Sequence, residues 1–215
     1  MSATHFWLIR HGETAWNAER RLQGWRDVPL NDVGVEQARR LGEHLRSGLF
    51  DNAVEVIVSS DLSRAYETAR LAAGHFELPI ASSPALRERS YGVYEGRDWN
   101  ELSGAGLSGH AAMNFRDPHH VVEQGETQHM FEMRVTQAFE DLAREHRGRK
   151  VMVFSHGGVI DVVWRKINHM AADAPRLTAI LNTSINQFSV QDGLWQAHLW
   201  GQVEHLQVSA LDDIG

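Results

Sequence analysis

The sequence predicts an α/β fold, a three-layer α/β/α sandwich with a mostly parallel central sheet and helices on both faces. Short apolar runs alternate with helical patterns, three runs end directly in polar residues, and a hairpin pattern lies near the C-terminus. The chain has 215 residues, of which 42% are hydrophobic, and this length is typical of one domain. We therefore expect residues 1–215 to form a single domain.

The N-terminal region predicts a buried strand followed by an amphipathic helix. Phe6–Ile9 is an apolar run followed at once by polar Arg10-His11-Gly12, a pattern typical of a strand with polar groups at its carboxyl end. Asn31-Asp32 then supplies a helix cap, and apolar residues recur at helical spacing until Gly48.

A second strand and helix follow. Val54–Val58 is rich in β-branched residues, which favours a strand. Ser59-Ser60-Asp61 then opens a helical stretch over Leu62–Ala73, with Arg64 near its first turn. Leu78–Ala81 is a further strand-like stretch.

The next region lacks a regular pattern. Residues 97–128 contain several glycines and no clear periodicity, so we expect a loop or a small irregular helical cap inserted into the domain. The apolar stripe from Phe131 to Leu142 then predicts a helix that ends near His146. Val151–Phe154 predicts a third apolar strand, which ends in Ser155-His156-Gly157-Gly158.

The remaining elements complete the fold. A helix is expected from Val159 to about Asn168. Ile185–Val190 and Leu194–Trp200 alternate around Gln191-Asp192-Gly193, which predicts an antiparallel hairpin.

The composition excludes several classes of function. The chain has 21 Lys and Arg against 28 Asp and Glu and no Lys/Arg-rich run, so we expect no nucleic-acid-binding face. It has no cysteine, which excludes disulfides, thiolate metal sites and a cysteine nucleophile. The apolar run Phe6–Ile9 is too short for a signal segment or a membrane span, so we expect a cytoplasmic protein that does not bind membranes.

Three strand ends present basic and polar side chains: Arg10-His11, Ser60 with Arg64, and Ser155-His156. The carboxyl ends of strands in such a sheet converge on one crevice, so two histidines and two arginines are expected to meet there. The guanidinium fork suits phosphate, and the sequence has no Walker-A loop, metal-spaced His/Cys set or Ser elbow. The pattern indicates phosphoryl transfer with a neutral histidine as nucleophile and without a metal.

Such a reaction also needs a carboxyl group that protonates the leaving alkoxide. Glu88, which follows the strand-like stretch 78–81, is the candidate acid, and Glu13 and Glu126 are its alternates. A rival class of function is metal binding through His110, His119-His120 and His129. It is disfavoured because adjacent histidines point in different directions and no His pair has zincin spacing with a carboxylate.

These residues resemble the motifs of the histidine phosphatase superfamily, in the branch that contains cofactor-dependent phosphoglycerate mutase. The signature is Leu8-Ile9-Arg10-His11-Gly12-Glu13-Thr14-Ala15-Trp16-Asn17. Further similarity spans most of the chain, in Gln23-Gly24-Trp25, Ser59-Ser60-Asp61-Leu62-Ser63-Arg64-Ala65, Glu88-Arg89, Tyr91-Gly92 and Ser155-His156-Gly157-Gly158. Gln124-Gly125-Glu126-Thr127 and Leu181-Asn182-Thr183-Ser184-Ile185-Asn186 also look like the broad-specificity and α-ribazole phosphatase branches.

The resemblance implies a role for each matching residue. His11 corresponds to the phosphorylated nucleophile, Arg10 and Arg64 to the phosphate clamps, His156 to the second histidine of the phosphate pocket and Glu88 to the proton donor. It also implies that Asn17, Gln23, Gly24 and Tyr91 contact the phosphoryl group or the substrate. The implied enzyme is metal-independent, needs no cofactor and acts on a small phosphorylated metabolite. Family members form both monomers and homodimers.

Departures from the mutase pattern favour a phosphatase that uses a phosphohistidine intermediate. Trp99 stands where glycolytic mutases have a substrate-binding lysine, the 97–128 insertion lacks their adjacent arginine pair, and the tail from Ala210 to Gly215 is acidic. The alternatives are a cofactor-dependent phosphoglycerate mutase and a non-catalytic relative that binds phosphorylated ligands. Aromatic residues are expected to give the substrate pocket an apolar lining or to belong to the core: Trp25, Tyr91, Tyr94, Trp99 and Phe115.

Overall fold

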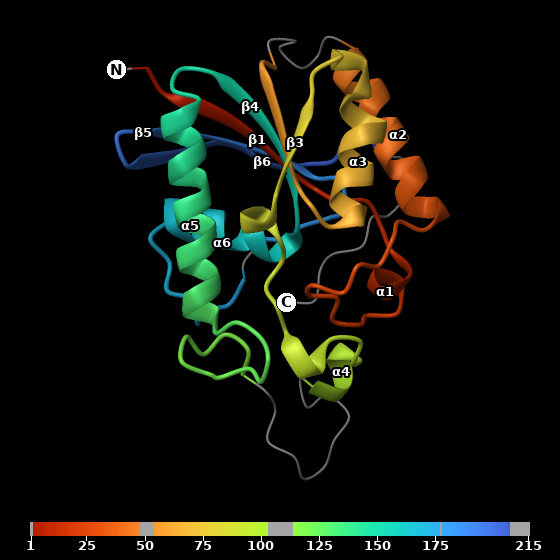
Figure 1. Ribbon diagram of the computed structural model, residues 1–215, viewed down its shortest axis with the longest axis vertical. Coiled ribbons are helices and arrows are strands. Elements are labelled where there is room, and N and C mark those ends of the chain that lie inside the picture. The colour runs from red at the N-terminus through yellow and green to blue at the C-terminus, as the bar shows by residue number, and fades with distance from the viewer. Residues whose placement is uncertain (1, 48–53, 103–113, 177, 207–215) are drawn as a thin grey trace.

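A six-stranded sheet forms the centre of the protein, in the strand order β3-β2-β4-β1-β5-β6 (Figure 1). The computed structural model describes residues 2–47, 54–102, 114–176 and 178–206. The strands are β1 (Thr4–Arg10), β2 (Val56–Ser60), β3 (Ile80–Ser83), β4 (Lys150–Ser155), β5 (Ile185–Gln191) and β6 (Leu194–Gln202).

Most of the sheet is parallel. β1 pairs with β4, β4 with β2, and β2 with β3, all in parallel, whereas β5 is antiparallel to both β1 and β6. The carboxyl ends of β1, β2 and β4 therefore lie at the same edge of the sheet, and each is followed by one of the predicted basic groups. The predicted mostly parallel sheet is confirmed.

Helices cover both faces of the sheet (Figure 1). α2 (Asp32–Arg46) and α3 (Ser63–Ala73) lie on one face, and α5 (Gln128–Glu145) and α6 (Gly157–Ile167) lie on the other. Alternate residues of β1 serve the two cores: Phe6 and Leu8 pack on the α5 and α6 side, and Trp7 and Ile9 on the α2 and α3 side. This burial of both faces explains why the strand sequence is continuously apolar, and the three-layer sandwich is confirmed.

Local hydrogen bonds fix several element ends. The predicted cap of α2 is present, since Asn31 Oδ1 accepts a hydrogen bond from Gly34 N at 2.8 Å. The predicted end of that helix at Gly48 falls outside the described residues, and α2 ends at Arg46. In the predicted hairpin, Asp192 and Gly193 have φ of 49° and 80°, as the common two-residue turn requires.

Two strands are shifted along the chain from their predicted ranges. The second strand begins at Val56 and not at Val54, and β3 is shifted from 78–81 to Ile80–Ser83. Both strands extend into serines, because the parallel register continues to Ser60 opposite Ser83. Hydrophobicity located these strands, but backbone pairing set their ends.

Apart from the irregular helical cap expected within 97–128, short helices were not predicted. α1 (Ala15–Ala18) is held by a reciprocal capping box between Thr14 and Asn17. α4 (Trp99–Leu102) lies at the start of the span for which we expected a loop or an irregular helical cap. Single turns of 3-10 helix occur at Gly74–Phe76, Pro84–Leu86 and Gly92–Tyr94. Such elements are too short to produce a readable period.

No helix in the described part of the chain is long and apolar enough to cross a membrane.

Candidate active site

Two buried histidines meet at the carboxyl edge of the sheet. His11 directly follows β1 and His156 directly follows β4, and these strands are neighbours. The ring centroids are 5.2 Å apart and the ring planes are inclined by 61°. The predicted convergence of strand ends therefore brings the two imidazoles together.

Close packing of the backbone holds the segment that carries His11. A Cβ at Gly12 would lie only 2.5 Å from the carbonyl oxygen of Gly34, in the first turn of α2. Glycine is required at this position because the backbone of Gly12 lies in direct contact with the backbone of Gly34.

The hydrogen bond of His11 selects its tautomer. His11 Nδ1 lies 2.7 Å from the carbonyl oxygen of Gly12. A carbonyl oxygen only accepts, so Nδ1 carries the proton of the neutral ring and Nε2 keeps its lone pair. His11 is thus prepared to act as a nucleophile through Nε2.

The surroundings also keep both imidazoles uncharged. Burial, followed by the charges of Arg64 and Arg10, holds the pKa of His11 well below its ordinary value of 6.5. The pKa of His156 is lowered in the same way, by burial and by Arg64, with smaller effects of His11, Arg10 and Arg134. Both rings are therefore neutral near pH 7.

His156 has one nitrogen bonded to protein and one suited to a ligand. Its Nε2 lies 2.8 Å from Ser60 Oγ, at the end of β2. Its Nδ1 is buried and has no hydrogen-bond partner within the residues that the structure describes. A phosphoryl oxygen is a suitable partner for this nitrogen.

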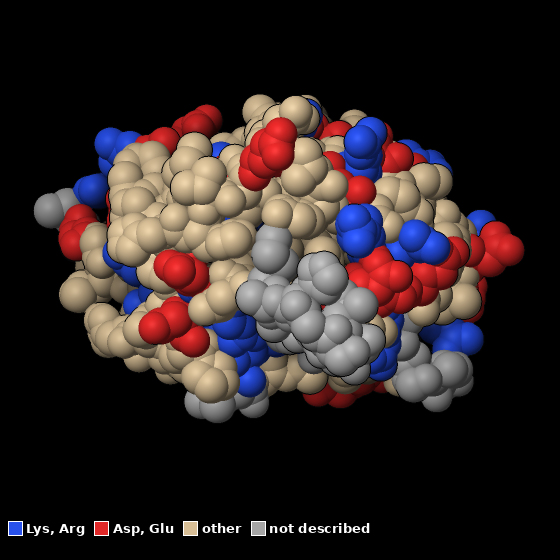
Figure 2. All heavy atoms as spheres, turned by 90° about the horizontal axis from the view of Figure 1, so that it is seen from below, with Lys and Arg blue, Asp and Glu red and all other residues tan. Residues whose placement is uncertain are grey.

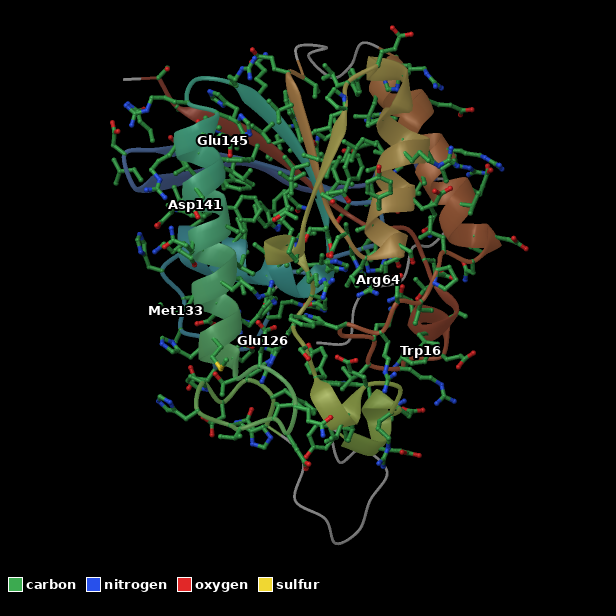
Figure 3. The ribbon with its side chains drawn as sticks, in the orientation of Figure 1. Trp16, Arg64, Glu126, Met133, Asp141 and Glu145 are labelled. Carbon is green, nitrogen blue, oxygen red and sulfur yellow. The ribbon has the colours of Figure 1, made fainter. Side chains whose placement is uncertain are left out.

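Two fully buried arginines complete the basic group. Arg10, the last residue of β1, donates from Nη1 to the carbonyl oxygen of Ile180 at 2.6 Å. Arg64 lies in the first turn of α3, at the lower end of that helix in Figure 3, and donates to the carbonyl oxygens of Arg26 and Gly24 at 2.9 and 2.8 Å. Buried guanidinium groups of this kind suit an oxyanion.

Glu88 is held in place by two backbone N–H groups. Its side chain is buried, Oε1 accepts from Arg89 N at 2.7 Å, and Oε2 accepts from Gly158 N at 2.9 Å. Of its alternates, Glu126 forms a two-bond ion pair with Arg134, and Glu13 accepts from Asn31 Nδ2 at 2.8 Å. Neither alternate is among the residues that line the cavity described next.

A cavity of about 90 Å³ opens beside these groups. His11, Arg64 and Glu88 all contribute to its wall, whereas Arg10 and His156 do not line it. The end of the molecule that carries the site is shown in Figure 2, where acidic and basic side chains are interspersed among uncharged ones. The cavity thus brings three of the predicted groups, the His11 imidazole, the Arg64 guanidinium and the Glu88 carboxylate, to the same small space.

The model of the histidine phosphatase superfamily (branch 1) matches residues 6–203. The chain belongs to this superfamily. Its Arabidopsis thaliana relatives include a phosphoglycerate mutase-like protein 4, 36% identical over 93% of this chain and 86% of the relative. A metal-independent phosphoserine phosphatase of the same plant is also 36% identical, over 94% of this chain and 83% of the relative. A mutant phosphoserine phosphatase from Entamoeba histolytica, solved with phosphoserine, has a TM-score of 0.80 at 25% identity, covering 94% and 99% of the two chains.

Three of the four substrate contacts that the superfamily motifs imply lie at the cavity: Gln23, Gly24 and Tyr91. Asn17 is not among the lining residues. Its Oδ1 instead accepts from the N–H and the hydroxyl of Thr14, at 3.1 and 3.0 Å, which caps α1. The role of Asn17 in substrate binding therefore stays a prediction.

Three of the five candidate aromatic residues line the cavity: Tyr91, Trp99 and Phe115. Trp99 stacks on Phe115 with ring centroids 5.8 Å apart. Trp25 instead donates from Nε1 to the carbonyl oxygen of Glu88 at 2.8 Å, and Tyr94 packs edge-on against Phe115 without lining the cavity.

Sequence reasoning missed several charged groups of the cavity wall. Arg21, Arg116, Arg176 and Asp161 line it in addition to the expected residues. Burial lowers the pKa of Arg116, partly offset by the nearby Asp161. Although the 97–128 insertion lacks the adjacent arginine pair of the mutases, the cavity wall is therefore not short of cations. The arginines come from segments far apart in the chain, and no local pattern connects them.

The metal alternative receives no geometric support from the described residues, among which no group of three or more His, Asp or Glu side chains could hold an ion. His110 lies outside the described residues.

A turn before β5 supports the backbone of the nucleophile. Asn182 Nδ2 donates to the carbonyl oxygen of His11 at 3.0 Å. The next residue, Thr183, has φ of 57°, and its hydroxyl lies 3.0 Å from Nε2 of His205. Burial, with a smaller effect of His44, lowers the pKa of His205 to about 4.

This histidine predicts acid sensitivity of the fold. Between its ordinary pKa of 6.5 and the folded value of about 4, the unfolded chain binds a proton that the folded chain does not. The contribution of His205 to the free energy of unfolding is therefore constant above pH 6.5 and falls as the pH drops toward 4. Denaturant titrations at neutral and acidic pH should show that His205→Gln loses less stability on acidification than the native chain. An equal loss in both proteins would contradict this assignment.

Proposed function

We propose that this protein is a metal-independent phosphomonoester phosphatase that acts on small phosphorylated metabolites through a phosphohistidine intermediate. The observation that carries the proposal is the neutral imidazole of His11, with its proton on Nδ1, between the buried cations Arg10 and Arg64. A neutral nucleophile next to fixed positive charges can attack a phosphate dianion, which would repel an anionic nucleophile.

In the first half of the reaction, Nε2 of His11 attacks phosphorus and the ester P–O bond breaks. Arg10, Arg64 and the second imidazole, His156, bind the phosphoryl oxygens, whose negative charge is spread in a loose transition state. Protonated Glu88 gives its proton to the leaving oxygen, so that the product is an alcohol and not an alkoxide.

The second half releases phosphate. Water attacks the phosphohistidine, the Glu88 carboxylate takes one proton from that water, and the P–N bond breaks as inorganic phosphate forms. His11 returns to its neutral form with the proton still on Nδ1. The two steps together consume one water and leave every protein group as it began.

The mutase is the alternative, and two observations favour it. The cavity contains arginines beyond Arg10 and Arg64, which would suit a charged phosphoglycerate, and several relatives are named phosphoglycerate mutase-like or probable phosphoglycerate mutase. Trp99 in the cavity wall and the relatives named phosphoserine phosphatase support hydrolysis. The non-catalytic alternative has less support, since His11, Arg64, Glu88 and His156 are all present and buried.

One assay separates these functions. The purified protein is given 3-phosphoglycerate with 2,3-bisphosphoglycerate and, separately, phosphoserine, α-ribazole phosphate and p-nitrophenyl phosphate, all with EDTA. We expect free phosphate from the monoesters and little 2-phosphoglycerate. Rapid 2-phosphoglycerate formation without phosphate release would make the protein a mutase, and activity that EDTA removes and a metal restores would overturn the metal-independent mechanism.

The added arginines predict a preference for substrates with a second anionic group. Arg116→Gln should raise KM for phosphoserine about tenfold, since it removes a charge-assisted hydrogen bond, and leave p-nitrophenyl phosphate nearly unchanged. Arg144→Gln, at an exposed position of α5, is the control. Equal changes in KM for phosphoserine and p-nitrophenyl phosphate would show that Arg116 does not recognise the part of the substrate outside the phosphoryl group.

Cytoplasmic location, homodimer formation and the lack of nucleic-acid binding are part of the same proposal. Cell fractionation, light scattering and a gel-shift assay would test them.

A further inference from the structure

The side chain of Arg134 connects α5 to the segment that carries Glu88. Its Nη1 donates to the carbonyl oxygens of Ala85 and Arg87 at 3.0 and 2.9 Å, and its Nη2 donates to that of Glu88 at 3.1 Å. One guanidinium therefore holds three carbonyl groups within four consecutive residues. Ala85 lies in the 3-10 turn Pro84–Leu86 and the other two residues directly follow it, so these carbonyls have no partners from a sheet ladder.

Glu126 closes this arrangement from the other side. Its two carboxylate oxygens each accept from Arg134 at 2.7 Å, and Oε2 also accepts from Ser90 N at 2.9 Å. The Arg134 and Glu126 side chains are only 20% and 13% exposed, so solvent screens the pair weakly. Figure 3 shows Glu126 near the lower end of α5.

The Glu88 side chain has little freedom to compensate for a shift of its backbone. Its carboxylate is bonded to the N–H groups of Arg89 and Gly158. A Cβ at Gly158 would overlap Glu88 Oε1, so the carboxylate lies directly against the start of α6. The position of the carboxylate therefore follows the position of residues 85–90.

We infer that the Arg134–Glu126 ion pair positions Glu88 for proton transfer to the leaving group. The inference rests on the proposed phosphatase function, in which Glu88 is the acid. Arg134 touches the backbone of Glu88 and is not itself among the residues that line the cavity, so it is a positioning residue and not a catalytic one. Glu126 balances the formal charge of Arg134, which also makes a small contribution to the lowered pKa of His156.

A positioning role predicts a dependence on the leaving group that a purely structural role does not. Arg134→Lys keeps the charge but cannot bond two carboxylate oxygens and three carbonyls at once. The rate of its first step, phosphoenzyme formation, should fall about tenfold or more on an alkyl phosphate such as phosphoserine. The initial burst on p-nitrophenyl phosphate, whose leaving group needs little protonation, should change less than about twofold in rate. Arg134→Met should show a larger effect of the same kind.

A neighbouring ion pair provides the matched control. Arg87 forms a two-bond pair with Asp61 at 2.7 and 2.6 Å and has similar partial burial, but its guanidinium bonds none of these carbonyls. Arg87→Met should lose stability without changing the ratio of the two activities. Gly158→Ala, which displaces the carboxylate directly, should change the ratio in the same direction as Arg134→Lys.

The double variant Glu88→Gln/Arg134→Lys identifies the route of the effect. If Arg134 acts through Glu88, the double variant should be no slower on the alkyl ester than Glu88→Gln alone. Three results would each overturn the inference. The first is a double variant whose loss on the alkyl ester equals the sum of the two single losses. The others are an Arg134→Lys loss that is equal on both esters, and an Arg87→Met protein whose ratio of the two activities changes as much as that of Arg134→Lys. If Glu88→Gln itself lowers the first step equally on both esters, the proposed role of Glu88 as the acid is wrong, which is a separate result.

Discussion

Replacing His11 by alanine is expected to abolish phosphate release, with a loss in kcat of more than about 10⁴-fold, because no other group can form the covalent intermediate. The fold should survive, since the imidazole makes one hydrogen bond to its own neighbour, Gly12. Release of phosphate under single- and multiple-turnover conditions measures the loss. The native enzyme should, in addition, yield an acid-labile phosphoenzyme when it is quenched during turnover.

The control for this variant is a histidine of the protein surface. His119→Ala changes an exposed side chain and should leave both turnover and the phosphoenzyme unchanged. Thermal unfolding of the His11→Ala protein, followed by circular dichroism, checks that it is folded. Retained turnover in a folded His11→Ala protein would eliminate the phosphohistidine mechanism.

The second large effect is expected for Glu88→Gln. An amide cannot supply the proton, so kcat on alkyl phosphates should fall about 10²- to 10⁴-fold, the usual contribution of general acid–base catalysis. The first step on p-nitrophenyl phosphate should be nearly unaffected, since p-nitrophenolate leaves without a proton. Initial bursts and steady-state rates on both esters measure the difference.

The substitution also affects the fold in a predictable way. Both oxygens of Glu88 accept backbone N–H groups, and the amide nitrogen of glutamine cannot accept either of them. The Glu88→Gln protein is therefore expected to be less stable by about 1–3 kcal/mol, which urea titration can measure. Equal losses of the first step on both esters would contradict the assignment of Glu88 as the acid.

The core of the site could be predicted from sequence because it follows from topology. Arg10, His11 and His156 lie at the ends of apolar strands, and parallel strands bring their carboxyl ends to one edge. Arg64 was predictable for the same reason, at the start of the helix after β2. The three-layer architecture followed from the alternation of strands and helices.

The rest of the cavity could not be predicted because it depends on contacts between irregular segments. Arg116 and Arg176 belong to stretches without periodicity, and their approach to the cavity depends on how those stretches fold over the sheet edge. For Asn17 the motif is present in the sequence, but the motif does not decide the role of the side chain. An asparagine three residues after Thr14 could either cap a short helix or contact a substrate. Only the structure reveals that Asn17 caps α1.

The bond between His11 Nδ1 and a peptide carbonyl affects how long a phosphorylated enzyme would persist. Phosphorylation at Nε2 leaves a positively charged imidazolium, and a carboxylate beside Nδ1 would stabilise that charge strongly. The Gly12 carbonyl offers only a dipole, and the neighbouring guanidinium groups oppose the positive ring. The P–N bond would therefore be strongly activated toward cleavage, so the phosphorylated form would be short-lived whenever water can reach it.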